Sequence, residues 1–193
     1  MEGNSRPPEV TAGLAPPGCL GPVEGLGTSP IVNVHLVLDR QVVDAPLLAC
    51  VGSPIQFLFD TTHSSGAESG QCLAISLSAA DRYIGQHPRQ LVRSFRQALD
   101  DIVPGARHAQ LVDAAVSREH GATFRAVPGT AALRPPARTG MEGLALAGAW
   151  CDTGWPATME GAVRSGLAAA EALLHDVGNE PASTVSMLEG GWR

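Results

Sequence analysis

The chain has 193 residues, with 13 basic and 19 acidic side chains and a formal net charge of -6. This length fits one ordinary domain or two small ones. The acidic balance excludes a basic nucleic-acid-binding face, so we expect no nucleic-acid partner. The 22 glycines and 15 prolines stand beside 44% hydrophobic residues, which indicates a chain rich in loops but able to fold.

Cysteine spacing and the first residues limit the class of protein further. Cys19, Cys50, Cys72 and Cys151 are far apart and form no CxxC pair, so we expect reduced thiols and no metal site. The chain does not start like a signal peptide, and no apolar run approaches the roughly 18 residues that span a bilayer. We therefore expect a cytoplasmic location, with peripheral contact at the inner membrane face as an extension of it.

The first third of the chain predicts a leader followed by a sheet. Residues 1–30 carry six prolines and few large apolar side chains, which is typical of a flexible leader. The alternation over 31–38 predicts a strand. Two apolar runs at 47–51 and 55–59 are separated by a Gly-Ser-Pro turn and predict a hairpin, and residues 72–78 alternate again. Together these segments predict an antiparallel or mixed sheet.

A helix and a connection follow. Apolar residues recur at helical spacing from Pro88 to Val103, and the Pro-Gly pair at 104–105 ends the pattern. We expect this helix to cover one side of the sheet. Residues 111–116 fit either a strand or a short helix, because alanine-rich runs do not separate the two. A second Pro/Gly-rich connection occupies 127–143.

The stretch 143–174 is the most informative part of the sequence. Residues 144–147 are wholly apolar, as expected for a buried parallel strand, and Gly148 allows a turn. From about Ala157, apolar residues recur at helical spacing beside a stripe of small residues. A strand that leads through glycine into a helix start presents free backbone amides and a positive dipole end, which suit an anion or a flavin edge. These residues alone are compatible with two interpretations, a ligand site and plain strand–helix packing.

Other chemistry finds less support. No GxSxG elbow is present, which disfavours a hydrolase. His35 fits a hydrogen-bonded sheet histidine better than a base, and Phe57 and Phe59 fit either core or pocket lining.

Three segments near the carboxy terminus carry a resemblance. Residues 147–150, 153–158 and 159–166 resemble the final FAD-contacting segment of the flavin amine oxidase and phytoene desaturase superfamily. Residues 29–35, 52–60 and 122–135 resemble, in the same order, its squalene-associated FAD-dependent desaturases, the hydroxysqualene dehydroxylases of bacterial hopanoid biosynthesis. The resemblance covers roughly residues 25–175.

The resemblance implies a mixed α/β (α+β) fold that forms the carboxy-terminal part of a two-domain FAD-dependent oxidoreductase. It divides the chain into the leader, a substrate-domain sheet with its helix over 31–126, an FAD-contacting strand-turn-helix over 127–175, and a tail over 176–193. It implies an apolar isoprenoid substrate near Phe57 and Phe59, and it assigns no catalytic residue. The implied FAD contacts are Gly148, Trp150, Asp152, Trp155, Pro156, Ala157, Thr158, Met159, Gly161 and Ala162, with no room for a large side chain at Gly161.

The sequence departs from the superfamily pattern in two ways. The acidic residue that usually follows the strand glycine is Ala149 here, with Asp152 as the other candidate for its role. The amino-terminal GxGxxG segment that cradles the pyrophosphate is absent from these 193 residues. We therefore expect a carboxy-terminal half that is inactive alone and needs an amino-terminal half-enzyme as partner chain. The alternatives are a phytoene desaturase or amine oxidase-like flavoenzyme, and a non-catalytic interaction fragment.

Overall fold

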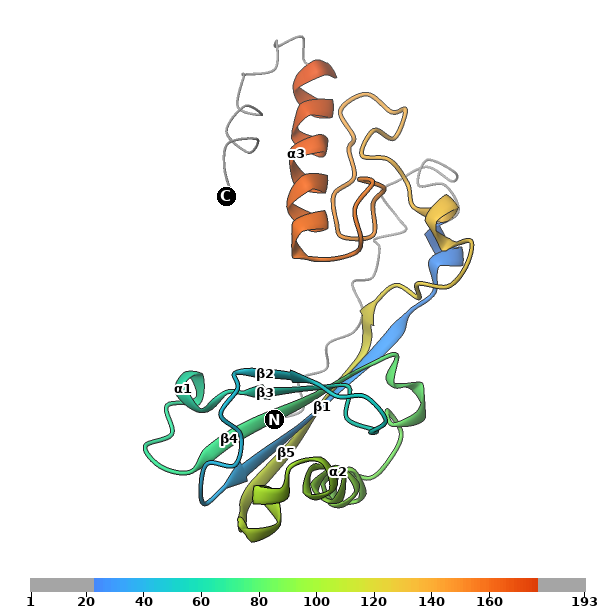
Figure 1. Cartoon of the computed structure of the whole chain (residues 1–193). Helices are drawn as coiled ribbons and strands as arrows, with labels where there is room; N and C mark the ends of the chain where they lie inside the picture. The colour runs from blue at the N-terminus through green and yellow to red at the C-terminus, as the bar shows by residue number, and fades with distance from the viewer. Residues whose placement is uncertain (1–22, 177–193) are drawn as a thin grey trace. The chain divides into compact units, whose positions relative to one another are not determined.

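The computed structural model describes residues 23–176, so the outer parts of the expected leader and tail, with Cys19, lie outside the described residues. The chain divides into two compact units. We call the described residues 28–122 the sheet unit, and residues 23–27 with 123–176 the loop–helix unit. Figure 1 shows the elements of each unit.

The sheet unit is built on five strands in the order β2-β3-β4-β1-β5. β1 pairs antiparallel with β4, β4 with β3, and β3 with β2, and the last pair confirms the predicted hairpin. At the other edge, the Asp39 amide donates to the Gln110 carbonyl at 3.0 Å, where β1 ends and β5 begins. The strands are β1 (Ser29–Leu38), β2 (Leu47–Ala49), β3 (Phe57–Asp60), β4 (Gln71–Ser78) and β5 (Leu111–Thr123). Residues 111–116, for which the sequence allowed a strand or a short helix, therefore lie in a strand.

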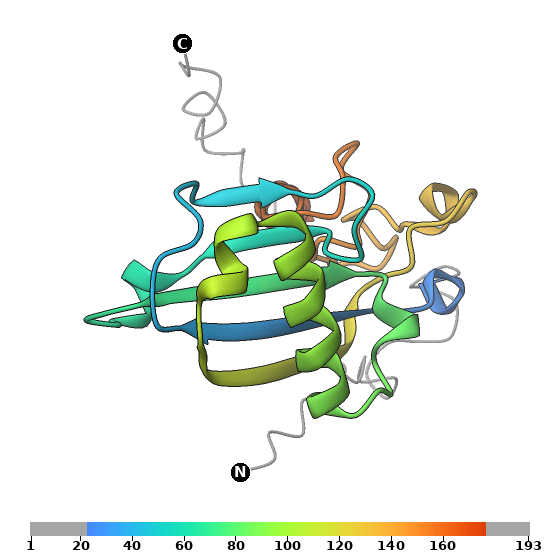
Figure 2. The same ribbon diagram turned by 60° about the horizontal axis from the view of Figure 1, so that its bottom comes forward.

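One face of this sheet is covered by α2 (Pro88–Ile102), as the periodicity predicts (Figure 2). The helix begins with proline in its first turn, and the His87 ring accepts a hydrogen bond from the Arg89 amide at 3.3 Å. Side chains at a spacing of two along β1 meet side chains at helical spacing along α2. The buried core formed in this way includes Val32, Val34, Leu36, Leu38, Leu91, Phe95, Ala98 and Leu99.

Short helices complete the connections. α1 (Thr62–Ser65) lies between β3 and β4, and 3-10 turns occupy Val23–Leu26, Ala80–Arg82, Pro104–His108 and Thr130–Leu133. Within residues 23–176, no helix is long and apolar enough to cross a membrane.

The loop–helix unit consists of α3 (Met159–Asp176) and the loops that precede it. The strand predicted over 144–147 is wrong: this segment forms only an isolated bridge between Arg138 and Ala145, and Leu144 and Leu146 are half-buried. A buried parallel strand needs neighbours on both sides to satisfy its backbone, and the described residues supply only this bridge. The predicted helix is present and begins at Met159.

Candidate functional site

The predicted FAD-contacting residues lie together on one loop and on the first turn of α3. Gly148 has φ of 154°, and a Cβ built on it would collide with the Trp150 indole. Its amide donates to the Ser165 hydroxyl at 2.9 Å, and that side chain is fully buried on α3. The start of the loop is therefore fixed to the helix at a position that only glycine can occupy.

The small-residue stripe predicted for α3 is the side of the helix that faces this loop. Gly161, Ser165 and Ala169 are its buried residues. Because a Cβ at Gly161 would lie 2.5 Å from the Pro156 carbonyl oxygen, the helix and loop backbones pack in direct contact. Cys151 is fully buried on the loop, and this burial raises the pKa of its thiol.

Arg134 holds the loop in shape, and sequence reasoning gave it no role. Its guanidinium donates to the Trp155 carbonyl at 2.8 Å and to the Ala149 carbonyl at 3.2 Å. It also donates to the carbonyls of Trp150 and Cys151. One side chain thus partners four backbone carbonyls of the loop, as the fixed fork of arginine donors permits. Nothing in the sequence indicates which arginine reaches carbonyls 15 to 21 residues further along the chain.

The start of α3 retains free donors. The Thr158 hydroxyl accepts from the Gly161 amide at 3.3 Å, in the manner of an N-cap. The amides of Met159 and Glu160 form no hydrogen bond within residues 23–176, and the Met159 side chain is 89% exposed. Free first-turn amides at the positive end of a helix dipole fit the electron-rich edge of a flavin ring.

The remaining predicted contacts differ in their accessibility. Asp152 is exposed, and its carboxylate accepts from the Gly154 amide at 3.1 Å, so it shapes a local turn. The Arg164 guanidinium lies over the Trp155 ring, 4.5 Å from the ring centroid, in a cation–π contact. Pro156 and Thr158 are exposed, and Ala157 and Ala162 are half-buried.

The sheet unit carries a second candidate surface on the face opposite α2, which we call the open face. Phe57 and Phe59 are 43% and 37% exposed there, so the core interpretation of these residues is wrong. Their ring centroids are 6.4 Å apart, and Leu47 pairs with Phe59 on the adjacent strand. Exposed apolar side chains on adjacent strands form a surface suited to an apolar molecule.

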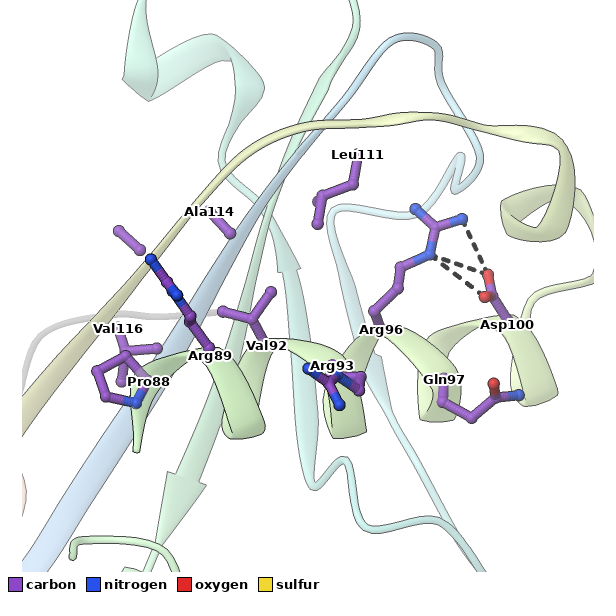
Figure 3. A pocket seen from close by; sticks show the side chains of 11 residues that line it. Pro88, Arg89, Val92, Arg93, Arg96, Gln97, Asp100, Leu111, Ala114 and Val116 are labelled. Carbon is purple, nitrogen blue, oxygen red and sulfur yellow. Dashed lines mark hydrogen bonds and ion pairs between the residues drawn. The ribbon is translucent and has the colours of Figure 1, made fainter. Parts of the chain in front are cut away.

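A hollow of about 590 Å³ lies elsewhere in the sheet unit, between α2 and β5. Figure 3 shows Arg96 and Asp100 at one end of it, joined by an ion pair of 3.1 Å. None of the residues predicted to bind cofactor or substrate lines this hollow.

Comparison with known proteins assigns the family. Residues 5–174 match the family described as flavin containing amine oxidoreductase. The chain belongs to this family, which confirms the superfamily resemblance and implies a flavin cofactor.

Two curated relatives are named hydroxysqualene dehydroxylase. The Sinorhizobium fredii protein is 35% identical over 88% of this chain, and the Rhodopseudomonas palustris protein is 34% identical over 87% of it. The 15-cis-phytoene desaturase of Solanum lycopersicum is 26% identical over 80% of the chain. The chain spans only 37% of the length of each dehydroxylase and 28% of the desaturase.

A solved structure shares the fold. A protein described as a protoporphyrinogen oxidase from Exiguobacterium sp. 255-15 superposes with a TM-score of 0.58 at 16% identity. The match covers 79% of this chain and 36% of that protein. The mixed α/β fold predicted from the sequence is therefore confirmed.

Proposed function

We propose that this chain supplies the substrate-binding sheet and the last flavin-contacting segment of an FAD-dependent enzyme that converts hydroxysqualene to squalene. The observation that carries the proposal is the loop 148–158, held by Arg134 against a helix start with free amides. The 35% identity to a hydroxysqualene dehydroxylase supports the choice of substrate. A place in bacterial hopanoid biosynthesis follows from that substrate.

The two units would contribute differently to the reaction. Bound FAD would supply the hydride chemistry. The first-turn amides of Met159 and Glu160 would favour negative charge on the adjacent ring edge, and Gly148 and Gly161 would keep the loop packed tightly against the helix that carries these amides. On the sheet unit, Phe57 and Phe59 would hold the apolar isoprenoid chain. Peripheral contact of a cytoplasmic protein with the inner membrane face would give access to such a substrate.

An amino-terminal half-enzyme is part of the proposal. The side of α3 away from the loop carries Met159, Val163, Leu167 and Leu174, which are between 37% and 89% exposed. Their spacing places them on one face of the helix. An exposed apolar stripe of this kind suits a further packed layer, and we propose that the dinucleotide-binding half supplies it.

The contacts in residues 148–162 are too few for the chain alone to retain FAD. A helix terminus contributes about 0.3 to 1 kcal/mol to the binding of an anionic group. Micromolar retention of FAD needs about 8 kcal/mol, so residues 148–162 leave most of the binding free energy to be supplied elsewhere.

The test is reconstitution. The chain is purified alone and with the part of the Sinorhizobium fredii dehydroxylase that precedes the matched region, each with excess FAD and then gel filtration. We expect flavin absorbance and squalene formation from hydroxysqualene, with a reductant, only for the mixture. A Val163→Asp, Leu167→Asp variant should not assemble, whereas the Glu171→Gln control should. Flavin retained by the chain alone, or a mixture without flavin, would overturn the proposal.

The phytoene desaturase relatives give a second candidate, because the open face would accept a longer polyene equally well. The reconstituted mixture is therefore also offered phytoene with a quinone acceptor. Desaturation without dehydroxylation would move the proposed substrate to that class.

A further inference from the structure

We propose that Asn33, His35 and Ser117 form a polar site on the open face that binds the hydroxyl group of the isoprenoid substrate. This inference rests on the proposed function and specifies how the substrate is recognised. It would make these three residues determinants of specificity between an isoprenoid alcohol and the corresponding hydrocarbon.

The first observation is that the three polar side chains converge on the open face. Asn33 and His35 are two residues apart on β1, so both side chains leave the sheet on the same face. Ser117 on β5 is 84 and 82 positions away in sequence from them. Its hydroxyl oxygen lies 3.4 Å from the Asn33 amide nitrogen and 3.4 Å from His35 Nε2. Two strands therefore bring three polar side chains to one point of the open face.

The second observation is unused hydrogen-bonding capacity. Both contacts to Ser117 are long, since hydrogen bonds between a nitrogen and an oxygen usually measure about 2.7 to 3.2 Å. Within the described residues, the Asn33 carbonyl oxygen and His35 Nδ1 form no hydrogen bond. An alcohol both donates and accepts, and this group offers donors and acceptors together.

The third observation is the arrangement of polar and apolar residues across the sheet. In the strand register, His35 pairs with Ala74, and Ala74 pairs with Phe59. One row further along, Asn33 pairs with Ser76, and Ser76 pairs with Phe57. The small side chains of Ala74 and Ser76 thus separate the polar site from the two phenylalanine rings. With strands about 4.8 Å apart, the separation is about 10 Å, which an isoprenoid chain spans easily.

These observations together predict selectivity for the alcohol. The apolar part of the ligand would lie on Phe57, Phe59 and Leu47, with its hydroxyl at the polar site. A hydrocarbon in the same place would cover the polar groups without satisfying them, and sites built to bond a hydroxyl reject analogues that lack it. We expect hydroxysqualene to bind at least about tenfold more tightly than squalene, within the range that such sites reach.

The test uses the full chain, labelled with ¹³C and ¹⁵N, in detergent micelles that carry hydroxysqualene or squalene. Both ligands should shift the ring resonances of Phe57 and Phe59. Only hydroxysqualene should shift the His35 ring nitrogens and the Asn33 side-chain amide. The His35→Phe and Ser117→Ala variants should lose most of the preference for the alcohol, and the exposed His63→Phe control should keep it.

The outcomes separate this inference from the proposed function. Equal affinity of the wild-type chain for both ligands, with shifts at Phe57 and Phe59, overturns the hydroxyl site and leaves the apolar surface intact. Absence of shifts at both phenylalanines overturns the surface and the hydroxyl site together. If a variant does not fold, the wild-type comparison of the two ligands still decides.

Discussion

Gly161 and Pro156 touch through their backbones: a Cβ at position 161 would lie 2.5 Å from the Pro156 carbonyl oxygen. This contact sets the distance between α3 and the loop that carries the predicted flavin contacts. A second helical glycine, Gly166, has nothing within 4 Å of its would-be Cβ. The two positions form a matched pair for mutation.

Gly161→Ala should destabilise the loop–helix unit by about 1 to 3 kcal/mol, the usual cost of overpacking a close contact. Gly166→Ala should instead stabilise the chain by up to about 1 kcal/mol through helix propensity. The readout is the rate at which the buried Cys151 is alkylated, resolved from the other cysteines by peptide mass spectrometry. Equal alkylation rates in the two variants would contradict the close packing.

Arg134→Met should open the loop, because four carbonyls lose a charged donor at once. A single hydrogen bond to a charged group contributes about 1.5 to 3 kcal/mol, so we expect a loss of at least about 2 kcal/mol. Arg134→Lys should rescue little, because an ammonium group cannot reach all four oxygens. Alkylation of Cys151 and quenching of Trp155 fluorescence report the opening.

The control for Arg134 is Arg138→Met, which breaks an ion pair of 3.1 Å between Arg138 and Asp176. The Arg138 side chain is 51% exposed, and surface pairs of this kind contribute about 0 to 1 kcal/mol. If Arg134→Met raises Cys151 alkylation and Trp155 quenching no more than Arg138→Met does, the loop holds its shape without the Arg134 guanidinium.

Gln71→Leu should destabilise the sheet unit by at least about 2 kcal/mol. The buried amide of Gln71 accepts from the backbone amides of Val42 and Val43, at 2.8 and 3.1 Å, and donates to Asp60 at 2.7 Å. Leucine would leave these groups buried without partners, at about 1 to 3 kcal/mol each. Urea unfolding measures the loss, and the exposed Gln97→Leu control should stay within about 0.5 kcal/mol of wild type.

Asp39 should make stability depend on pH at the acid end. Hydrogen bonds from Arg40 and from the Gln110 amide lower the pKa of Asp39 from 3.8 to about 2. A depressed pKa stabilises the fold above pH 3.8, and this contribution is lost as the pH falls toward 2. The difference in unfolding free energy between wild type and Asp39→Asn should therefore shrink across this window. A difference that stays constant down to pH 2 would contradict the assignment.

The sequence by itself determined the elements whose burial repeats at a fixed period. Alternation along β1 and β4 and the 3.6-residue spacing along α2 reflect which side of each element faces the core, and that information is local. The turn at Gly148 and the small residues along α3 could also be predicted locally, because glycine tolerates a positive φ at Gly148 and lets backbones pack in contact at Gly161.

Only the tertiary structure decided the relationships that depend on how distant segments meet. Periodicity separates the two faces of β3 but does not show which face a helix covers, so the sequence favoured the core over pocket lining for Phe57 and Phe59, and only the structure shows them exposed. The segment 144–147 has the composition of a buried strand, yet pairing depends on neighbours that the described residues do not supply. The four carbonyls bound by Arg134 and the meeting of Ser117 with Asn33 and His35 follow from chain paths that no local pattern encodes. Hydrogen bonds between distant segments are fixed by the packing of the whole unit, which is why these features became visible only in three dimensions.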